Sequence, residues 1–189
     1  MKETLRRTLQ KKRKTITKSE LLEKSISIQK RLFSLPEFNQ AKTILFYVSY
    51  DNEVFTHEMI KESLSKGKTI VIPKTNTKKN TLTLLEVTCW DDLEKGAYTI
   101  LEPKKHCIKE IPLPQIDLLI IPGVGFDPYG NRIGHGMGYY DRLLKQTPHN
   151  VCIALAFEFQ IVEHIPAEEH DIRVHKIITE ERVITCSSS

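Results

Sequence analysis

Apolar positions recur along this chain in two patterns, one typical of helices and one of buried strands. Leu5 and Leu9 form a thin apolar stripe that predicts a first short helix. Apolar residues then recur at spacings of three and four between residues 21 and 33, which predicts a second helix as far as about Ser34. The segment "THEMIKESLSKG" (56–67) predicts a third.

Helix boundaries are also readable in the sequence. Thr17 and Glu20 in "TKSE" fit a capping box at the start of the second helix, and Pro36 ends that helix. Thr56 is the predicted N-cap of the third helix, and Gly67 its end.

Runs of apolar and β-branched residues predict strands, most of them covered on both faces. The runs are "TILFYVSY" (43–50), "TIVIP" (69–73), the more exposed "TLTLLEV" (81–87), "IDLLIIPG" (116–123) and "VCIALAF" (151–157). Strands that alternate with helices predict parallel pairing, so we expect a layered α/β/α domain with a mostly parallel central sheet. Residues 1–189 form one predicted domain, and the polar stretch 74–81 is the one candidate linker.

Composition narrows the class of protein. A chain of 189 residues with 40% hydrophobic content can build one real core. The four cysteines are widely spaced without a C-x-x-C pair, which favours reduced thiols and a cytoplasmic location. No apolar run approaches the roughly 20 residues that cross a bilayer. We therefore expect a soluble protein without a membrane partner, and a monomer.

Basic residues crowd the start of the chain, although the net charge is only +4. They are Lys2, Arg6, Arg7, Lys11, Lys12, Arg13 and Lys14. Three interpretations stay open: a nucleic-acid-binding arm, a solvated helix face, or cations that fold back onto an anionic small ligand. Lys2 and Arg6 are four apart, so both lie on one side of a helix and can act together.

Six of the eight glycines fall within residues 123–138. They are Gly123, Gly125, Gly130, Gly134, Gly136 and Gly138, and Asp127–Gly130 suits a tight turn. The segment follows the most apolar strand and precedes a helix marked by Tyr140, Leu143 and Leu144, the place where open α/β sheets bind ligands. Such a backbone can adopt positive φ and lie against a phosphate. The P-loop and the dinucleotide fingerprint both fail here, and an irregular flexible turn is the plainer alternative.

The glycine segment also resembles a known family. "IIPGVGFDPYGNRIGHGMGYYDRLL" (120–144) is similar to the signature of the 5-formyltetrahydrofolate cyclo-ligases. "KETLR" (2–6), "SYDNEVFT" (49–56), "LEPKKH" (101–106) and "ALAFEFQIVEHIPAEEHDIRV" (154–174) follow in the family's order. The resemblance implies an enzyme that uses ATP to phosphorylate the N5-formyl oxygen of 5-formyltetrahydrofolate. N10 then attacks, giving 5,10-methenyltetrahydrofolate, ADP and phosphate.

The resemblance also implies site residues. The ATP-binding positions are Lys2, Glu3, Thr4, Leu5, Arg6, Arg132, Ile133, Gly134, His135, Gly136, Met137, Gly138, Tyr139 and Tyr140. Arg132 is the expected catalytic residue, because phosphoryl transfer needs positioning and dispersal of charge. The folate-binding positions are Val48, Glu53, Tyr98 and Tyr139. Tyr140 is expected to point toward the core.

Asp141 and Asp171 match the family's Mg²⁺ carboxylates, and carboxylate oxygens suit this ion. Each residue also has an explanation that needs no metal. The carboxylate of Asp141 would stabilise the first turn of a helix, and Asp171 could pair with Arg173. Three histidines lie toward the end of the chain: His164, His170 and His175. Their spacing matches no common zinc site, so we set zinc aside.

His135 departs from the pattern, because many relatives carry arginine there. We expect it to contact the nucleotide, so that ATP affinity falls as pH rises and the imidazole loses its proton. Two alternatives to the cyclo-ligase remain at this point. One is a sugar-phosphate isomerase or acyl transferase, although the loop shows no nucleophile paired with a base. The other is a nucleic-acid-binding module, which lacks interleaved aromatic residues in the basic start.

Overall fold

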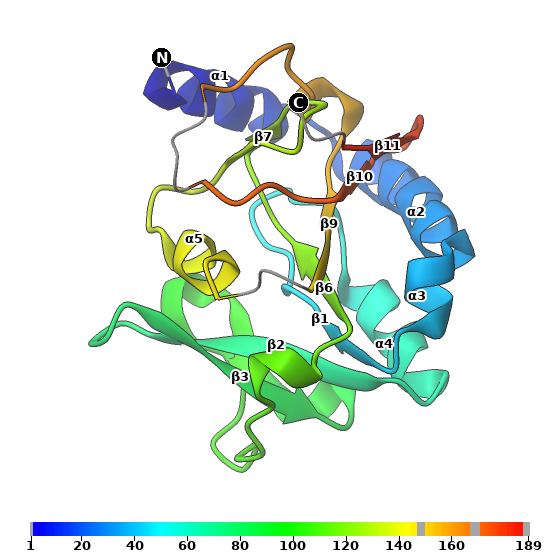
Figure 1. Cartoon of the computed structure of the whole chain (residues 1–189), viewed down its shortest axis with the longest axis vertical. Coiled ribbons are helices and arrows are strands. Elements are labelled where there is room, and N and C mark those ends of the chain that lie inside the picture. Colours follow the sequence, from blue (N-terminus) through cyan, green and yellow to red (C-terminus); the bar gives the residue numbers. More distant parts are fainter. Residues whose placement is uncertain (1, 147–149, 167–170, 187–189) are drawn as a thin grey trace.

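The computed structural model describes residues 2–146, 150–166 and 171–186. A seven-stranded sheet forms its centre, in the order β11-β10-β9-β6-β1-β2-β3 (Figure 1). The strands are β1 Thr43–Leu45, β2 Thr69–Asn76, β3 Thr81–Val87, β6 Leu118–Ile121, β9 Val151–Leu155, β10 Lys176–Ile178 and β11 Val183–Thr185. The interior pairs are parallel, and only the edge strands β3 and β11 run antiparallel. The predicted mostly parallel sheet is confirmed, whereas β10 and β11 were not predicted.

Helices cover both faces of this sheet. They are α1 Lys2–Lys14, α2 Lys18–Ser34, α3 Pro36–Gln40, α4 His57–Ser65 and α5 Tyr139–Leu144. Side chains of α2, α3 and α4 pack on one face, and Leu143 and Leu144 of α5 pack on the other. The first helix lies apart, where Leu9 joins Val124, Ile133 and Ile165 in a small apolar cluster beyond the end of β6.

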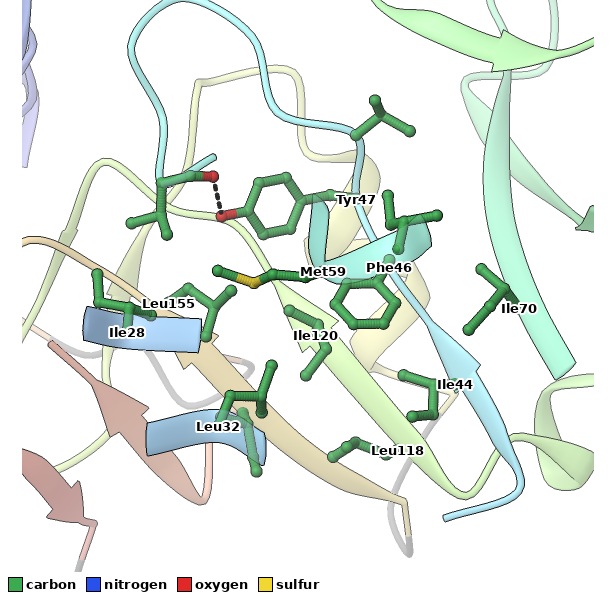
Figure 2. Packing of buried hydrophobic residues seen from close by; sticks show 14 of the residues in the cluster. Ile28, Leu32, Ile44, Phe46, Tyr47, Met59, Ile70, Leu118, Ile120 and Leu155 are labelled. Atoms are coloured by element: carbon green, nitrogen blue, oxygen red, sulfur yellow. Dashed lines mark hydrogen bonds between the residues drawn. The ribbon is translucent and has the colours of Figure 1, made fainter. Parts of the chain in front are cut away.

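Alternation along each strand divides the core between the two faces. On β1, Ile44 faces the α2 side and Leu45 the α5 side, and both are fully buried. Figure 2 shows Ile44 near Leu118 and Ile120 of β6, with Leu32 of α2 packed over them. Each such side chain contributes roughly 1.5–3 kcal/mol by leaving water. Runs without polar alternation therefore predicted a sheet covered on both sides correctly.

The boundaries of α2 follow the sequence. The hydroxyl of Thr17 accepts from the N–H of Glu20 at 3.2 Å, and the Glu20 carboxylate accepts from the N–H of Thr17 at 2.9 Å. The predicted capping box is therefore confirmed. Pro36 ends the helix as predicted and also occupies the first turn of the short α3.

The segment after β1 differs from the prediction, because the ladder ends at Leu45 rather than at residue 50. The sequence predicted that Thr56 caps α4, but its hydroxyl makes no capping hydrogen bond to that helix. It donates to the carbonyl of Tyr47 at 2.8 Å and accepts from the N–H of Ser49 at 3.0 Å. The Tyr47 hydroxyl donates to the carbonyl of Val54 (Figure 2). These side-chain hydrogen bonds take the place of backbone hydrogen bonds to a neighbouring strand. Residues 46–56 therefore form a separate segment that leaves the sheet.

Short elements complete the fold. Two small antiparallel pairs are β4 Leu93–Lys95 with β5 Leu101–Pro103, and β7 Gly125–Phe126 with β8 Arg132–Ile133. Single 3-10 turns span Trp90–Asp92, Ala97–Thr99, Leu113–Gln115 and Glu158–Gln160. Residues 74–81 are not a linker, because they form the tip of the β2–β3 hairpin. Within the described ranges, no helix has the length and apolar character needed to span a membrane.

Candidate active site

A pocket of about 360 Å³ is lined mainly by three segments, and Gln10 of α1 and Pro73, Thr75 and Leu82 of the β2–β3 hairpin also line it. One segment follows β1 (residues 47–53), one belongs to the β4–β5 hairpin (98–102), and one is the glycine segment (132–141). Most of the predicted site residues line it: Val48, Glu53, Tyr98, Arg132, Gly134, His135, Met137, Gly138, Tyr139, Tyr140 and Asp141. The fold thus brings the four predicted folate-binding positions and part of the predicted ATP-binding positions to one cavity.

A buried turn anchors the glycine segment. The carboxylate of Asp127, fully buried, accepts from the N–H groups of Tyr129, Asn131 and Ile165 at 2.9–3.0 Å. Gly130 has a φ of +87°, and its N–H closes the turn on the carbonyl of Asp127 at 3.0 Å. The predicted turn at 127–130 is confirmed, and it fixes the start of β8, which carries Arg132.

The glycines of the segment have different roles. A Cβ on Gly123 would lie 2.4 Å from the ring of Phe126, and one on Gly125 would lie 2.5 Å from Leu9. Those two permit close packing, a role that the sequence did not indicate. Gly136 and Gly138 instead have φ of +98° and +68°, which side chains rarely adopt. The backbone freedom predicted for a phosphate loop is therefore concentrated just before α5.

Arg132 is a buried cation in this pocket. Its side chain is 4% exposed, pairs with the carboxylate of Asp141, and donates to the carbonyl of Pro122 at 3.3 Å. Burial lowers the pKa of Arg132, and the nearby carboxylates of Asp141 and Asp171 oppose that shift. The guanidinium is thus held in one orientation by an acceptor on the rim and an acceptor on the backbone.

The basic first helix packs against the glycine segment, next to the place where the sequence predicted an anionic ligand. The ammonium of Lys2 donates to Asp171 at 2.8 Å, and Nε of Arg6 donates to the carbonyl of Gly134 at 2.9 Å. Glu3 pairs with the guanidinium of Arg6. Among the described residues of α1, Gln10 is the one that lines the pocket. Arg6 does not line it but contacts Gly134, which does.

Glu53 receives polar contacts from both sides of the pocket. Its side chain is 5% exposed, and its two oxygens accept from Nε2 of His135 at 2.9 Å and from the N–H of Tyr50 at 3.1 Å. Nη1 of Arg13 lies 3.9 Å from the same carboxylate. His135 therefore contacts the carboxylate of Glu53, a residue predicted to bind the folate. The sequence did not indicate this contact. Arg13 and Tyr50 were also missed.

The predicted aromatic and apolar positions divide between pocket and core. Tyr140 packs against both core clusters, as expected, and burial raises the pKa of its hydroxyl well above the usual range. Arg142 lies over the ring of Tyr139, 5.3 Å from its centroid. Tyr98 is 52% exposed with φ of +56°, and it reaches the pocket from its hairpin. Ile133 is 2% exposed and packs under α1, so its side chain faces away from the pocket.

The two predicted metal ligands each pair with a predicted ATP-binding cation, Asp141 with Arg132 and Asp171 with Lys2. Their side chains are 55% and 26% exposed, and both act electrostatically on Arg132. Carboxylates of this kind, both accessible and one of them in the glycine segment, suit Mg²⁺. Of the three histidines considered for zinc, His170 lies outside the described residues, and Nδ1 of His175 accepts from the N–H of Cys152.

Metal-ligating side chains gather elsewhere at the base of the β4–β5 hairpin. Asp92, His106 and Cys107 form the one such group of three in the described ranges. Asp92 accepts from Nε2 of His106 at 2.9 Å and from the N–H of Thr88 at 2.7 Å. Together with the N–H of Lys104, which donates to the carbonyl of Asp92, these bonds close the hairpin that carries Tyr98.

Comparison with known proteins agrees with this geometry. Residues 1–180 match the sequence model of the 5-formyltetrahydrofolate cyclo-ligase family. The mouse 5-formyltetrahydrofolate cyclo-ligase is 30% identical over 95% of this chain and 94% of its own length, and the Escherichia coli K12 enzyme is 30% identical over 93% and 98%. The solved structure of Aquifex aeolicus 5,10-methenyltetrahydrofolate synthetase is 32% identical, with a TM-score of 0.87, over 100% of this chain and 94% of that one.

Proposed function

The chain belongs to the 5-formyltetrahydrofolate cyclo-ligase family, and we propose that its pocket holds ATP and 5-formyltetrahydrofolate side by side. The family's function is the ATP-dependent conversion of 5-formyltetrahydrofolate to 5,10-methenyltetrahydrofolate, and this chain is an enzyme of that class. One observation carries the proposal: a single cavity is lined by both the glycine segment and the segment after β1. The family match removes the grounds for an isomerase or acyl transferase.

On the nucleotide side, the phosphates would lie along the glycine segment from Arg132 to Tyr140, with Lys2 to Arg6 of α1 beside it. The positive φ of Gly136 and Gly138 supports this placement, because it lets backbone N–H groups face an anion. The Arg6 contact with Gly134 also supports it, since the contact brings a second cation to the same loop.

On the folate side, we assign Val48, Glu53, Tyr98 and Tyr139 to the reduced pterin. The buried Glu53 carboxylate supports this assignment, because carboxylate oxygens accept hydrogen bonds from ring N–H groups. Val48 is 4% exposed and supplies an apolar surface next to that carboxylate. Tyr98 and Tyr139 face the same cavity from the hairpin and from α5.

The chemistry is a phosphoryl transfer followed by ring closure. The γ-phosphoryl group of ATP moves to the N5-formyl oxygen and ADP leaves. N10 then bonds to the formyl carbon, the bond from that carbon to the phosphorylated oxygen breaks, and phosphate and the N10 proton depart. Arg132 would disperse charge on the transferring group from a fixed position, which is the main demand of such a step. N10 is itself the nucleophile, so the pocket needs no side-chain nucleophile.

Asp141 and Asp171 are the residues that would hold Mg²⁺, and each would exchange its present cation partner for the ion. When bound, the ion neutralises charge on the nucleotide phosphates. The partial exposure of both carboxylates supports this exchange, because an ion from solvent can reach them while Arg132 keeps its bond to the carbonyl of Pro122.

The remaining assignments are that the enzyme acts as a monomer in the cytoplasm, with small-molecule substrates and no nucleic-acid or membrane partner. Four free thiols are consistent with a reducing compartment. The contacts that Lys2, Arg6 and Arg13 make with the rest of the chain favour a ligand-binding role for α1 over a nucleic-acid-binding arm.

A direct assay tests the proposed function. The purified chain is mixed with 5-formyltetrahydrofolate, ATP and Mg²⁺, and the absorbance of the methenyl product is followed together with ADP release. We expect one ADP per product and no product when ATP is left out. Turnover without ATP, or a chain that releases ADP without forming product, would contradict it.

A further inference from the structure

One face of α1 runs along the pocket from the glycine segment to Glu53. Lys2, Arg6, Gln10 and Arg13 are spaced by four, four and three residues, which places them on the same side of the helix. Lys2 contacts Asp171, Arg6 contacts the glycine segment at Gly134, and Gln10 lines the pocket. Arg13, the last residue of this row, lies beside Glu53, which is assigned to folate binding.

Arg13 is the most deeply buried charge on this face. The residue is 2% exposed, although it belongs to a helix rich in solvated lysines. Its Nη2 donates to Asp51 at 3.5 Å, and Nη1 lies 3.9 Å from Glu53. Nε and Nη1 have no hydrogen-bond partner among the described residues. Burying a cation is costly unless opposite charge compensates it, so the position needs a reason beyond packing.

The partners of Arg13 belong to the turn that presents Glu53. Asp51 and Asn52 have left-handed φ of 45° and 58°, and the N–H of Glu53 closes the turn on the carbonyl of Tyr50 at 3.0 Å. The Asn52 side chain donates to the carbonyl of Arg13 at 3.4 Å. The end of α1 therefore holds the turn at three successive residues, while Arg13 itself does not line the pocket.

We propose that Arg13 is a positioning residue for the folate side of the pocket, acting through Glu53. It fixes the carboxylate against the Asp51 turn, so that one oxygen stays bonded to the N–H of Tyr50 and the other faces His135 and the pocket. Charged contacts of Glu53 come from α1 through Arg13 and from the glycine segment through His135. The inference rests on the proposed function, because the substrate it positions for is the folate assigned to this pocket.

The test separates folate binding from ATP binding. In Arg13→Met we expect the KM and the calorimetric Kd for 5-formyltetrahydrofolate to rise roughly 10-fold, as for a weakened charged hydrogen bond, while the KM for ATP changes less than about 2-fold. Arg13→Lys keeps the charge without the planar fork and should recover part of the loss. Lys11→Met removes an exposed cation of the same helix and serves as the matched control, with both constants unchanged.

A double-mutant cycle decides whether Arg13 acts through Glu53. If it does, adding Arg13→Met to Glu53→Gln costs little more in folate affinity than Glu53→Gln alone. Full additivity would overturn the proposal, as would an equal rise in both KM values, or a lowered melting temperature with unchanged folate affinity. Failure of the proposed function looks different, because the unaltered protein would then bind no 5-formyltetrahydrofolate, and both proposals would fall together.

Discussion

Two walls of the pocket hold their charges in different ways. The loop wall, residues 132–141, pairs the guanidinium of Arg132 with Asp141, whose side chain is 55% exposed. The second wall is residues 47–53, which follow β1 and are called the sheet wall here. In it the side chain of Glu53 is 5% exposed and lies beside that of Arg13, which is 2% exposed. Arg132 is itself buried, but a half-exposed carboxylate can exchange its cation for an ion at lower cost than one in a pair whose two groups are both buried. The loop wall is thus built for exchange and the sheet wall for fixed shape.

The largest effect should come from the loop wall. Arg132→Ala removes the buried cation assigned to the transferring phosphoryl group, and we expect kcat to fall roughly 10²- to 10³-fold, as when one transition-state donor is deleted. The fold should survive, because the Asp141 carboxylate left behind is more than half exposed. Turnover and circular dichroism measure the two outcomes. Near-normal kcat would remove Arg132 from the mechanism, and Arg7→Ala on the outer face of α1 is the control.

The sheet wall should respond in KM and in stability together. Glu53→Gln weakens a charged acceptor, so we expect the KM for 5-formyltetrahydrofolate to rise roughly 10- to 100-fold with little change in the KM for ATP. The melting temperature should also fall, because the change leaves Arg13 buried beside a neutral group. Asp141→Asn on the loop wall should lower the melting temperature less, because Asp141 is half exposed and Arg132 keeps its bond to the carbonyl of Pro122 and the nearby charge of Asp171. Equal stability losses at the two positions would contradict the contrast between the walls.

The sequence predicted the loop wall better than the sheet wall, and the reason is the range of the contacts. Glycine spacing and the turn at 127–130 are local signals, so the backbone around Arg132 could be anticipated. The Arg13 contact with Asp51 spans 38 residues, and no local pattern encodes it. The helical spacing of Lys2, Arg6 and Arg13 was the available signal, but the crowd of solvated lysines around it concealed which cation is buried.

The same distinction explains errors in the fold. Thr56 has the sequence of an N-cap, yet its hydroxyl bonds the backbone of residues 47 and 49, because the end of β1 leaves those groups without ladder partners. Periodicity predicts which residues are buried in a strand, as for Ile44 and Leu45, but it does not predict where pairing stops.

His135 joins the two walls, and its replacement sharpens the comparison. If His135 contacts the phosphates, we expect the unaltered protein and His135→Arg to differ in how the KM for ATP depends on pH between 6 and 8.5, because only arginine carries a fixed charge. His135→Arg keeps its charge, so its KM for ATP should change less over that range. Because Nε2 of His135 contacts Glu53, the variant should also alter the KM for the folate several-fold. Identical pH profiles for the two proteins would discard a role of His135 at the phosphates.

The smallest effect should come from the base of the hairpin that carries Tyr98 into the pocket. Hydrogen bonds from His106 and Thr88 hold the pKa of Asp92 well below its ordinary range. A carboxylate with a lowered folded pKa contributes stability above its unfolded pKa of about 4, and loses it as pH falls toward the folded value. Asp92→Asn should therefore melt a few degrees below the unaltered protein at pH 7, and the gap should narrow as pH is lowered from 4 to 3. The folate KM should stay within about 2-fold, because Asp92 closes the hairpin from outside the pocket. A difference in melting temperature that stays constant with pH would mean that Asp92 stabilises the protein through packing alone. A large rise in the folate KM would mean that the hairpin also shapes the folate side of the pocket.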